Sequence, residues 1–135
     1  MRHAALCAVF ILAIALHSEA QTALGPGMRA EALVKACELA DAGPNASFGD
    51  SAKSFNVGYC LGYMWGVLVS HDFFVVATTL AGGKPIFCAA TDKISVGQAV
   101  KVFLKYAQDH PEELHIDASN LVVEALMKAF SCGPR

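Results

Sequence analysis

Four stretches of this chain repeat apolar residues at the three- and four-residue spacing of an amphipathic helix. They run from Met28 to Ala40, from Ser51 to about Leu80, from Ser95 to about Ala107 and from Pro111 to Phe130. The fourth stretch has the most regular pattern, with one apolar face made of Leu114, Ala118, Leu121, Val122, Ala125, Leu126 and Phe130. The pattern predicts a small all-α domain of four or five helices.

The second stretch is the longest, and the structure of its last part is ambiguous in the sequence. Either Asp50 or Ser51 is a suitable N-cap, and Gly82 and Gly83 with Pro85 mark the end. The β-branched run from Phe73 to Thr79 fits a strand, a separate helix after a break at residues 71–72, or a continuation of the same helix. We favour a helical assignment for this run, and the pattern does not decide whether it continues the second helix to Leu80.

Three glycines fall four residues apart in the second stretch, at Gly58, Gly62 and Gly66. Each costs up to about 1 kcal/mol relative to alanine in a helix, so close approach of a second helix is the expected compensation. The same GxxxG spacing occurs in membrane helices. The strongly apolar part, from Val57 to Val69, is shorter than the roughly 20 residues that span a bilayer, so we expect no stable membrane insertion.

The first 20 residues have the pattern of a secretory signal peptide. A positive start at residues 1–3 precedes an apolar run from Ala4 to Leu16, and small residues precede an expected cleavage after Ala20. Residues 21–27 then form a short linker that ends in Gly-Pro-Gly, and residues 28–135 form one domain. We therefore expect an exported protein located in the periplasm.

Four cysteines remain after removal of the leader, which takes Cys7 with it. In an oxidising compartment this even number predicts two disulfides among Cys37, Cys60, Cys88 and Cys132. A 37–60 bridge would join the first two helices and an 88–132 bridge would clamp the last two, but all three pairings remain open. A zinc site is disfavoured because there is no CxxC pair to place two ligands together.

Charge and motifs exclude several classes of function. Loss of Arg2 and Glu19 from the 10 basic and 12 acidic residues leaves 9 and 11, and no basic cluster is present to bind nucleic acid. The sequence contains no GxSxG, HExxH or phosphate-binding loop. His71 and Asp72 could form a base with its orienting carboxylate, but they equally fit a polar break in a helix. We expect no catalytic site, metal or cofactor.

Several short motifs, taken in order, resemble the Rap/Tai immunity proteins. The first is Cys60-Leu61-Gly62-Tyr63 followed by Gly66. The second half supplies the others, in the family's order: Phe87-Cys88, Ser95-x-x-Gln98 with Tyr106, His110-Pro111-Glu112, and Ala125-Leu126 before Phe130-x-Cys132. Ala89-Ala90 and Ser131 stand where family members carry prolines, which are loop positions.

The resemblance implies a helical, disulfide-bonded, non-catalytic domain that often forms homodimers. Its function would be to neutralise a type VI secretion amidase that cleaves peptidoglycan. For the contact with that partner we single out the 81–94 loop, for its length and exposed composition, and within it Lys84, Ile86, Asp92 and Lys93. The alternative is a periplasmic chaperone similar to the HdeA acid chaperones, although no dense carboxylate cluster supports acid activation.

Overall fold

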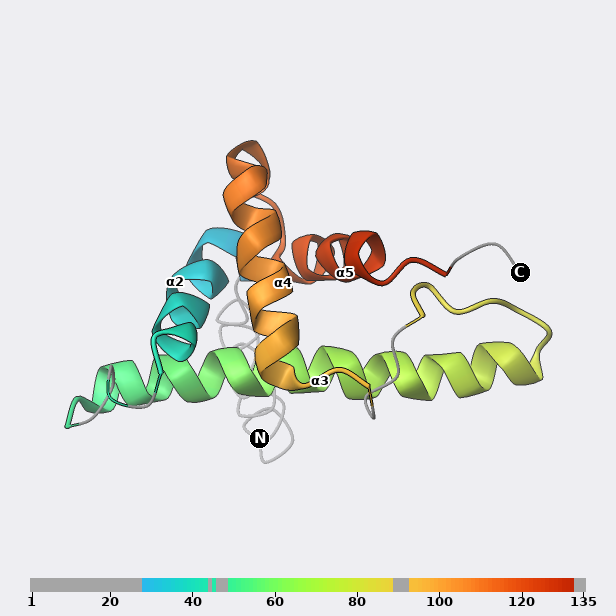
Figure 1. The fold of residues 1–135 in the computed structure, drawn as a ribbon, viewed down its shortest axis with the longest axis horizontal. Helices are drawn as coiled ribbons and strands as arrows, with labels where there is room; N and C mark the ends of the chain where they lie inside the picture. Colours follow the sequence, from blue (N-terminus) through green and yellow to red (C-terminus); the bar gives the residue numbers. More distant parts are fainter. Residues whose placement is uncertain (1–27, 44, 46–48, 89–92, 133–135) are drawn as a thin grey trace, which may run out of the picture.

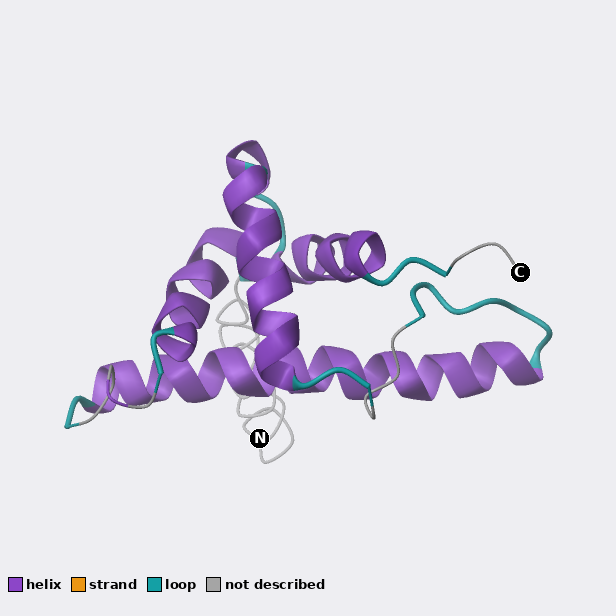
Figure 2. Ribbon diagram, viewed as in Figure 1, coloured by secondary structure: helices purple, strands orange, loops and turns teal. Residues whose placement is uncertain are grey.

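The computed structural model confirms the all-α class. It describes residues 28–43, 45, 49–88 and 93–132, so the expected leader and linker lie outside the described residues. The described helices are α2 (Ala30–Asp41), α3 (Ser51–Leu80), α4 (Val96–Asp109) and α5 (Ala118–Ala129), with a 3-10 turn, η2, at Pro111–Glu113. In this part of the chain there is no strand, only an isolated bridge between Arg29 and Asp117 (Figure 2).

Helix α3 is the long axis of the molecule, and the other helices stand on one side of it. In Figure 1, α2 and α5 lie above α3, α4 rises above it from an end that overlaps α3 in this view, and the segment that follows α3 folds back over its second half. At about 1.5 Å per residue, the 30 residues of α3 give a rod of roughly 45 Å. Helices α2 and α5, each of 12 residues, are far shorter, so they cover only one flank of that rod.

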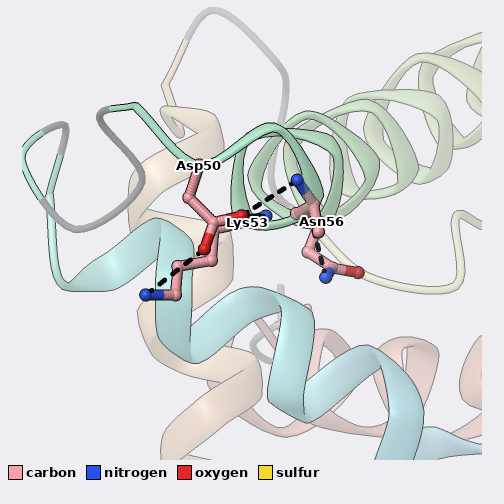
Figure 3. Close-up of polar contacts among 4 residues, drawn as sticks. Asp50, Lys53 and Asn56 are labelled. Carbon is pink, nitrogen blue, oxygen red and sulfur yellow. Dashed lines mark hydrogen bonds and ion pairs between the residues drawn. The ribbon is translucent and has the colours of Figure 1, made fainter.

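The start of α3 is fixed by the predicted cap. The carboxylate of Asp50 accepts hydrogen bonds from the backbone N–H groups of Ala52 and Lys53, at 3.0 Å each (Figure 3). The bond from the Lys53 backbone is the main reason that the pKa of Asp50 lies below its ordinary value. Asn56 adds a bond from its side-chain amide to the carbonyl of Ala52. From this cap the helix continues unbroken to Leu80, which settles the ambiguous run as helix.

The core lies where α2 and α4 pack on the inner face of α3 and α5 packs on α2 and α4. That face contributes Cys60, Met64 and Leu68, which are at most 1% exposed. The buried hydrophobic residues of the other elements complete the core: Ala30, Leu33, Ala36, Cys37, Phe87, Ile94, Ala99, Val100, Phe103, Tyr106, Ala107, Ala118, Leu121, Val122, Ala125 and Leu126. The stripes predicted for the third and fourth helices therefore do face the core.

The disulfides join Cys37 to Cys60 and Cys88 to Cys132. The first pair links α2 to the middle of α3, and the second links the loop after α3 to the segment after α5. For separations of 23 and 44 residues, the loop-closure model gives a stabilisation of roughly 3–4 kcal/mol each. All four cysteines of the described residues are therefore paired.

The predicted start of the fourth helix at Pro111 is wrong. Pro111 begins the short turn η2, and α5 begins at Ala118 with Asp117 as its N-cap. The carbonyls of Leu114 and Ile116 accept hydrogen bonds from the backbone N–H groups that open α2, at 3.0 and 2.9 Å. These carbonyls therefore accept hydrogen bonds from α2 and not from a following helical turn. The next α-helix begins only after Asp117, whose side chain accepts a hydrogen bond from the backbone N–H of Ser119 at 2.9 Å.

The helix expected against the glycine stripe is also missing from the described part of the chain. A Cβ atom built on Gly58, Gly62 or Gly66 would meet no described atom within 4 Å. These glycines lie opposite the Cys60 face that α2 covers. By length and composition α3 could cross a membrane, and only 22% of its most apolar window is buried inside the bundle. Nevertheless its inner face is an integral part of the core.

Candidate partner-binding loop

The 81–94 loop begins with a glycine turn that ends α3 sharply. Gly82 has a φ of 75°, in the left-handed region that favours glycine. Its N–H donates to the carbonyl of Thr79, and the N–H of Gly83 donates to the carbonyl of Thr78 at 2.7 Å. This is the Schellman arrangement, in which two otherwise unpaired carbonyls of the last helical turn are satisfied. It turns the chain back over α3.

A buried contact with His71 then holds the returning chain against α3. The imidazole of His71 stacks on the ring of Phe87, with centroids 3.6 Å apart and planes inclined by 10°. The Nε2 atom of His71 is 2.9 Å from the carbonyl oxygen of Phe87. Both residues are buried, at 8% and 1% exposure, so the contact is screened from solvent. Phe87 therefore works as the apolar anchor of the loop.

The next residue, Cys88, is held twice by the segment that follows α5. Its backbone N–H donates to the carbonyl of Phe130 at 2.8 Å, and its sulfur is bonded to that of Cys132. The described first half of the loop is thus tied at both ends, to α3 by the glycine turn and to the end of α5 by Cys88. Between these points the backbone has little freedom to move.

The structure describes three of the four candidate contact residues, and all three are exposed. Ile86 is 59% exposed although its neighbour Phe87 is buried. Lys84 and Lys93 are also exposed, whereas Asp92 lies outside the described residues. Lys84 and Ile86 lie on the fixed part of the loop. Lys93 lies just before Ile94, which is 5% exposed and returns the chain to the core.

An apolar groove of about 490 Å³ lies beside the loop. Ile86 and Phe87 line it from the loop, Gly66 and Phe74 from α3, and Val123 from α5. His71 also lines the groove, and its Nδ1 is buried without a hydrogen bond, 3.5 Å from a carboxylate oxygen of Asp72. The loop and the groove together present an exposed isoleucine, a cationic side chain and an adjacent apolar recess on one surface.

Each described histidine places one ring nitrogen close to a backbone carbonyl oxygen. The Nε2 of His71 faces the carbonyl of Phe87, so in this arrangement the ring cannot take a proton from a substrate through that atom. His110 and His115 each direct Nδ1 to a backbone carbonyl in their own turn, as expected of local capping. Among the described residues, no group of three His, Cys, Asp or Glu side chains is placed to hold a metal ion.

A polar cluster around Tyr106, away from the loop, is not apparent from the sequence. The Tyr106 hydroxyl lies 3.3 Å from a carboxylate oxygen of Glu113 and of Glu124. Burial first, and then these two carboxylates, raise the pKa of Tyr106 to about 12. The ring stacks on His110, and the ammonium of Lys128 lies 5.1 Å from its centroid. Every group in the cluster is thus engaged in joining α4, η2 and α5.

Comparison with known proteins gives one family match. A family model described as Rap1a immunity proteins matches residues 29–132, which include all four described helices and both disulfides. No curated protein and no solved structure matches.

Proposed function

Because this chain belongs to the Rap1a immunity proteins, we propose that it neutralises a secreted peptidoglycan amidase of a type VI secretion system by occluding its active site. The chain acts in the periplasm, where the substrate of such a toxin is located. It acts as a binding protein, without chemistry of its own. The fixed and exposed first half of the 81–94 loop is the observation that carries this proposal.

A protein that blocks an active site must present a rigid projection. Ordering a flexible loop costs affinity, about 0.5–1.5 kcal/mol for each immobilised side chain, and a preformed loop avoids much of this cost. The glycine turn, the Phe87 anchor and the Cys88–Cys132 disulfide fix the loop backbone before any partner arrives. Ile86, exposed between these supports, is then the anchor that enters the cleft.

The rest of the loop surface supplies specificity. Lys84 and Lys93 contribute positive charge at the rim of the contact, where charges set orientation and association rate. The apolar groove lined by Phe74 and Phe87 receives an apolar element from the rim of the toxin's cleft. An interface with a central apolar anchor and a polar rim is the usual arrangement in tight protein complexes.

The two disulfides support an extracytoplasmic location. Disulfides persist in oxidising compartments, and the bacterial periplasm is one of them. Loss of the 88–132 bridge in a reducing compartment would free the loop from the segment after α5. The proposal therefore requires that the oxidised form be the one that binds.

The test is a pull-down with the oxidised chain, exported to the periplasm, as bait. Candidate toxins are the products of neighbouring open reading frames, expressed beside it. The expected result is capture of an amidase with a Kd near the nanomolar range that is usual for tight complexes of this size. Recovery of no amidase, or of many unrelated proteins whose number grows at acidic pH, would contradict the proposal and favour the chaperone alternative.

A further inference from the structure

The two disulfides differ in their access to solvent. Cys37 and Cys60 are both 0% exposed, and their bond lies in the contact between α2 and α3. Cys88 and Cys132 are both exposed, where the loop after α3 is joined to the segment after α5. In Figure 1 these two segments extend beyond the end of α5, toward the opposite end of α3 from α2. One disulfide is therefore inside the core and the other is at the surface.

Access to solvent decides how readily a disulfide exchanges with a thiol. The attacking thiolate must reach a sulfur atom, so a buried disulfide reacts only after the elements around it have separated. For the Cys37–Cys60 bond these elements are α2 and α3, which carry the fully buried Leu33 and Met64. The Cys88–Cys132 bond requires no such opening. Exposed disulfides are generally the more labile ones, and regulatory disulfides are found among them.

The packing of the helices does not depend on the exposed disulfide. Neither Cys88 nor Cys132 belongs to the buried core. When their bond is reduced, the Cys88 N–H can still donate to the carbonyl of Phe130, 2.8 Å away, and Phe87 can still stack on His71. The buried disulfide continues to join α2 to α3. Reduction of the exposed bond therefore removes a covalent tie of the loop and leaves the helices in place.

We propose that Cys88–Cys132 is a thiol-exchange site, which a dithiol such as that of a Cys-x-x-Cys oxidoreductase reduces and re-forms while the domain stays folded. A thiolate of the reductant attacks one of the two sulfurs, and the other sulfur leaves as a thiolate and takes up a proton. The second thiol of the reductant then attacks the reductant's own sulfur in the mixed disulfide. This step releases the second cysteine, which is also protonated, and oxidises the reductant to a disulfide. Two electrons and two protons thus pass to the chain, and the reverse reaction restores the bond.

The effect of this exchange on binding rests on the proposed function, in which the loop occludes the cleft of an amidase. In the oxidised form the loop that presents Ile86 is fixed by the disulfide in addition to the Phe87 anchor. In the reduced form the partner must order part of the loop during binding, which weakens the complex. We expect the affinity for the amidase to fall by at least about tenfold on reduction. The site is therefore a redox switch of the loop.

Reduction of the folded chain by dithiothreitol tests the site without any partner. Samples are quenched with N-ethylmaleimide at increasing times, and mass spectrometry of the peptides locates the alkylated cysteines. Cys88 and Cys132 should be labelled at least about 100-fold faster than Cys37 and Cys60, because the buried pair reacts only through opening of the core. Circular dichroism should show the helix content unchanged after the fast step. The matched control is the same reaction in urea that unfolds the chain, where the two pairs should react at similar rates.

Three results would overturn the inference. The first is equal labelling of the two pairs in the folded chain, and the second is loss of helix content when the exposed bond is reduced. The third is a chain reduced only at Cys88 and Cys132 that binds the amidase as tightly as the oxidised chain, since the site would then not control the loop. Absence of amidase binding by either form would contradict the proposed function alone, because the labelling rates are measured without the amidase.

Discussion

His71 and Phe87 form a buried contact in which a polar side chain of α3 holds the returning loop. Their rings are stacked at 3.6 Å, and the Nε2 of His71 is 2.9 Å from the carbonyl oxygen of Phe87. These residues are 16 positions apart in the chain. The contact holds the loop that follows α3 against the helix itself.

Replacement of His71 by leucine should loosen the loop without breaking α3. The variant keeps an apolar side chain against Phe87 but leaves its buried carbonyl without a donor, which costs about 1–3 kcal/mol. Hydrogen exchange should quicken at residues 82–88, and the free energy of unfolding should fall by a similar amount. The control is His115→Leu, an exposed position where we expect a change within about 0.5 kcal/mol. Equal changes in hydrogen exchange and in the free energy of unfolding for the two variants would contradict the role of His71 in anchoring the loop.

The two disulfides should have separable effects. Conversion of Cys88 and Cys132 to serine should weaken partner binding, because the loop loses its tie to the end of α5. Conversion of Cys37 and Cys60 should lower the stability by a comparable amount, roughly 3–4 kcal/mol, yet leave binding intact well below the melting temperature. Thermal unfolding and titration calorimetry of the two double variants measure both quantities. Equal losses of affinity in the two variants would contradict the assignment of the loop.

The cap at Asp117 should stabilise the domain at neutral pH, and its contribution should be lost in acid. The Ser119 hydroxyl, more than the Ser119 backbone, holds the pKa of Asp117 below its ordinary value of 3.8. Since the folded pKa is lowered, the stabilisation is present above that ordinary value and is lost as pH falls through the folded pKa. Asp117→Ala should therefore destabilise the domain at neutral pH. Urea unfolding at descending pH should show the difference from wild type shrinking below about pH 4.

Tyr106 should make the domain sensitive to alkali. Its pKa is raised to about 12, first by burial and then by Glu113 and Glu124. Because the pKa of Tyr106 is raised in the folded state, the contribution of its neutral hydroxyl to the stability of the domain is complete below the ordinary pKa of 10. This contribution is lost as pH rises from 10 towards 12. Burial also raises the pKa of Tyr63, so ultraviolet titration should show delayed ionisation for both tyrosines. Tyr106→Phe should abolish the step near pH 12 and reduce the alkaline loss of stability. If Tyr106→Phe left the titration curve unchanged, Tyr106 would not be the source of the late ionisation step.

The elements that rest on local signals were predictable from the sequence. Asp50, one of the two candidate caps, caps α3, and Ser95, in the Ser95-x-x-Gln98 motif, caps α4 by accepting from the backbone N–H of Gln98. The apolar stripe of α4 also faces the core as predicted. The two bridges that hold the structure together were considered from the sequence, but choosing them required the helices to be placed in space.

Features that depend on distant contacts were not predictable. Pro111 and two glutamates favour a helix start locally, but the carbonyls of Leu114 and Ile116 are claimed by the backbone that opens α2. In the sequence, His71 fits a polar break in a helix. Its contact with the loop becomes apparent only when the fold places Phe87 against it. The sequence shows that α3 is apolar on both sides but not which side is covered. The Cys37–Cys60 bridge, by fixing α2 on one side, leaves the glycine stripe bare.

The most direct measurement is the activity of the captured amidase on peptidoglycan during titration with this protein. We predict complete inhibition at one copy per enzyme. A loop variant with Lys84, Ile86, Asp92 and Lys93 replaced by alanine should bind at least about 30-fold more weakly, as loss of a 2 kcal/mol hot spot implies. The matched control, Lys101→Ala with Met127→Ala, alters exposed residues on other helices and should inhibit fully. Full amidase activity at saturating protein, or unchanged inhibition by the loop variant, would contradict the account.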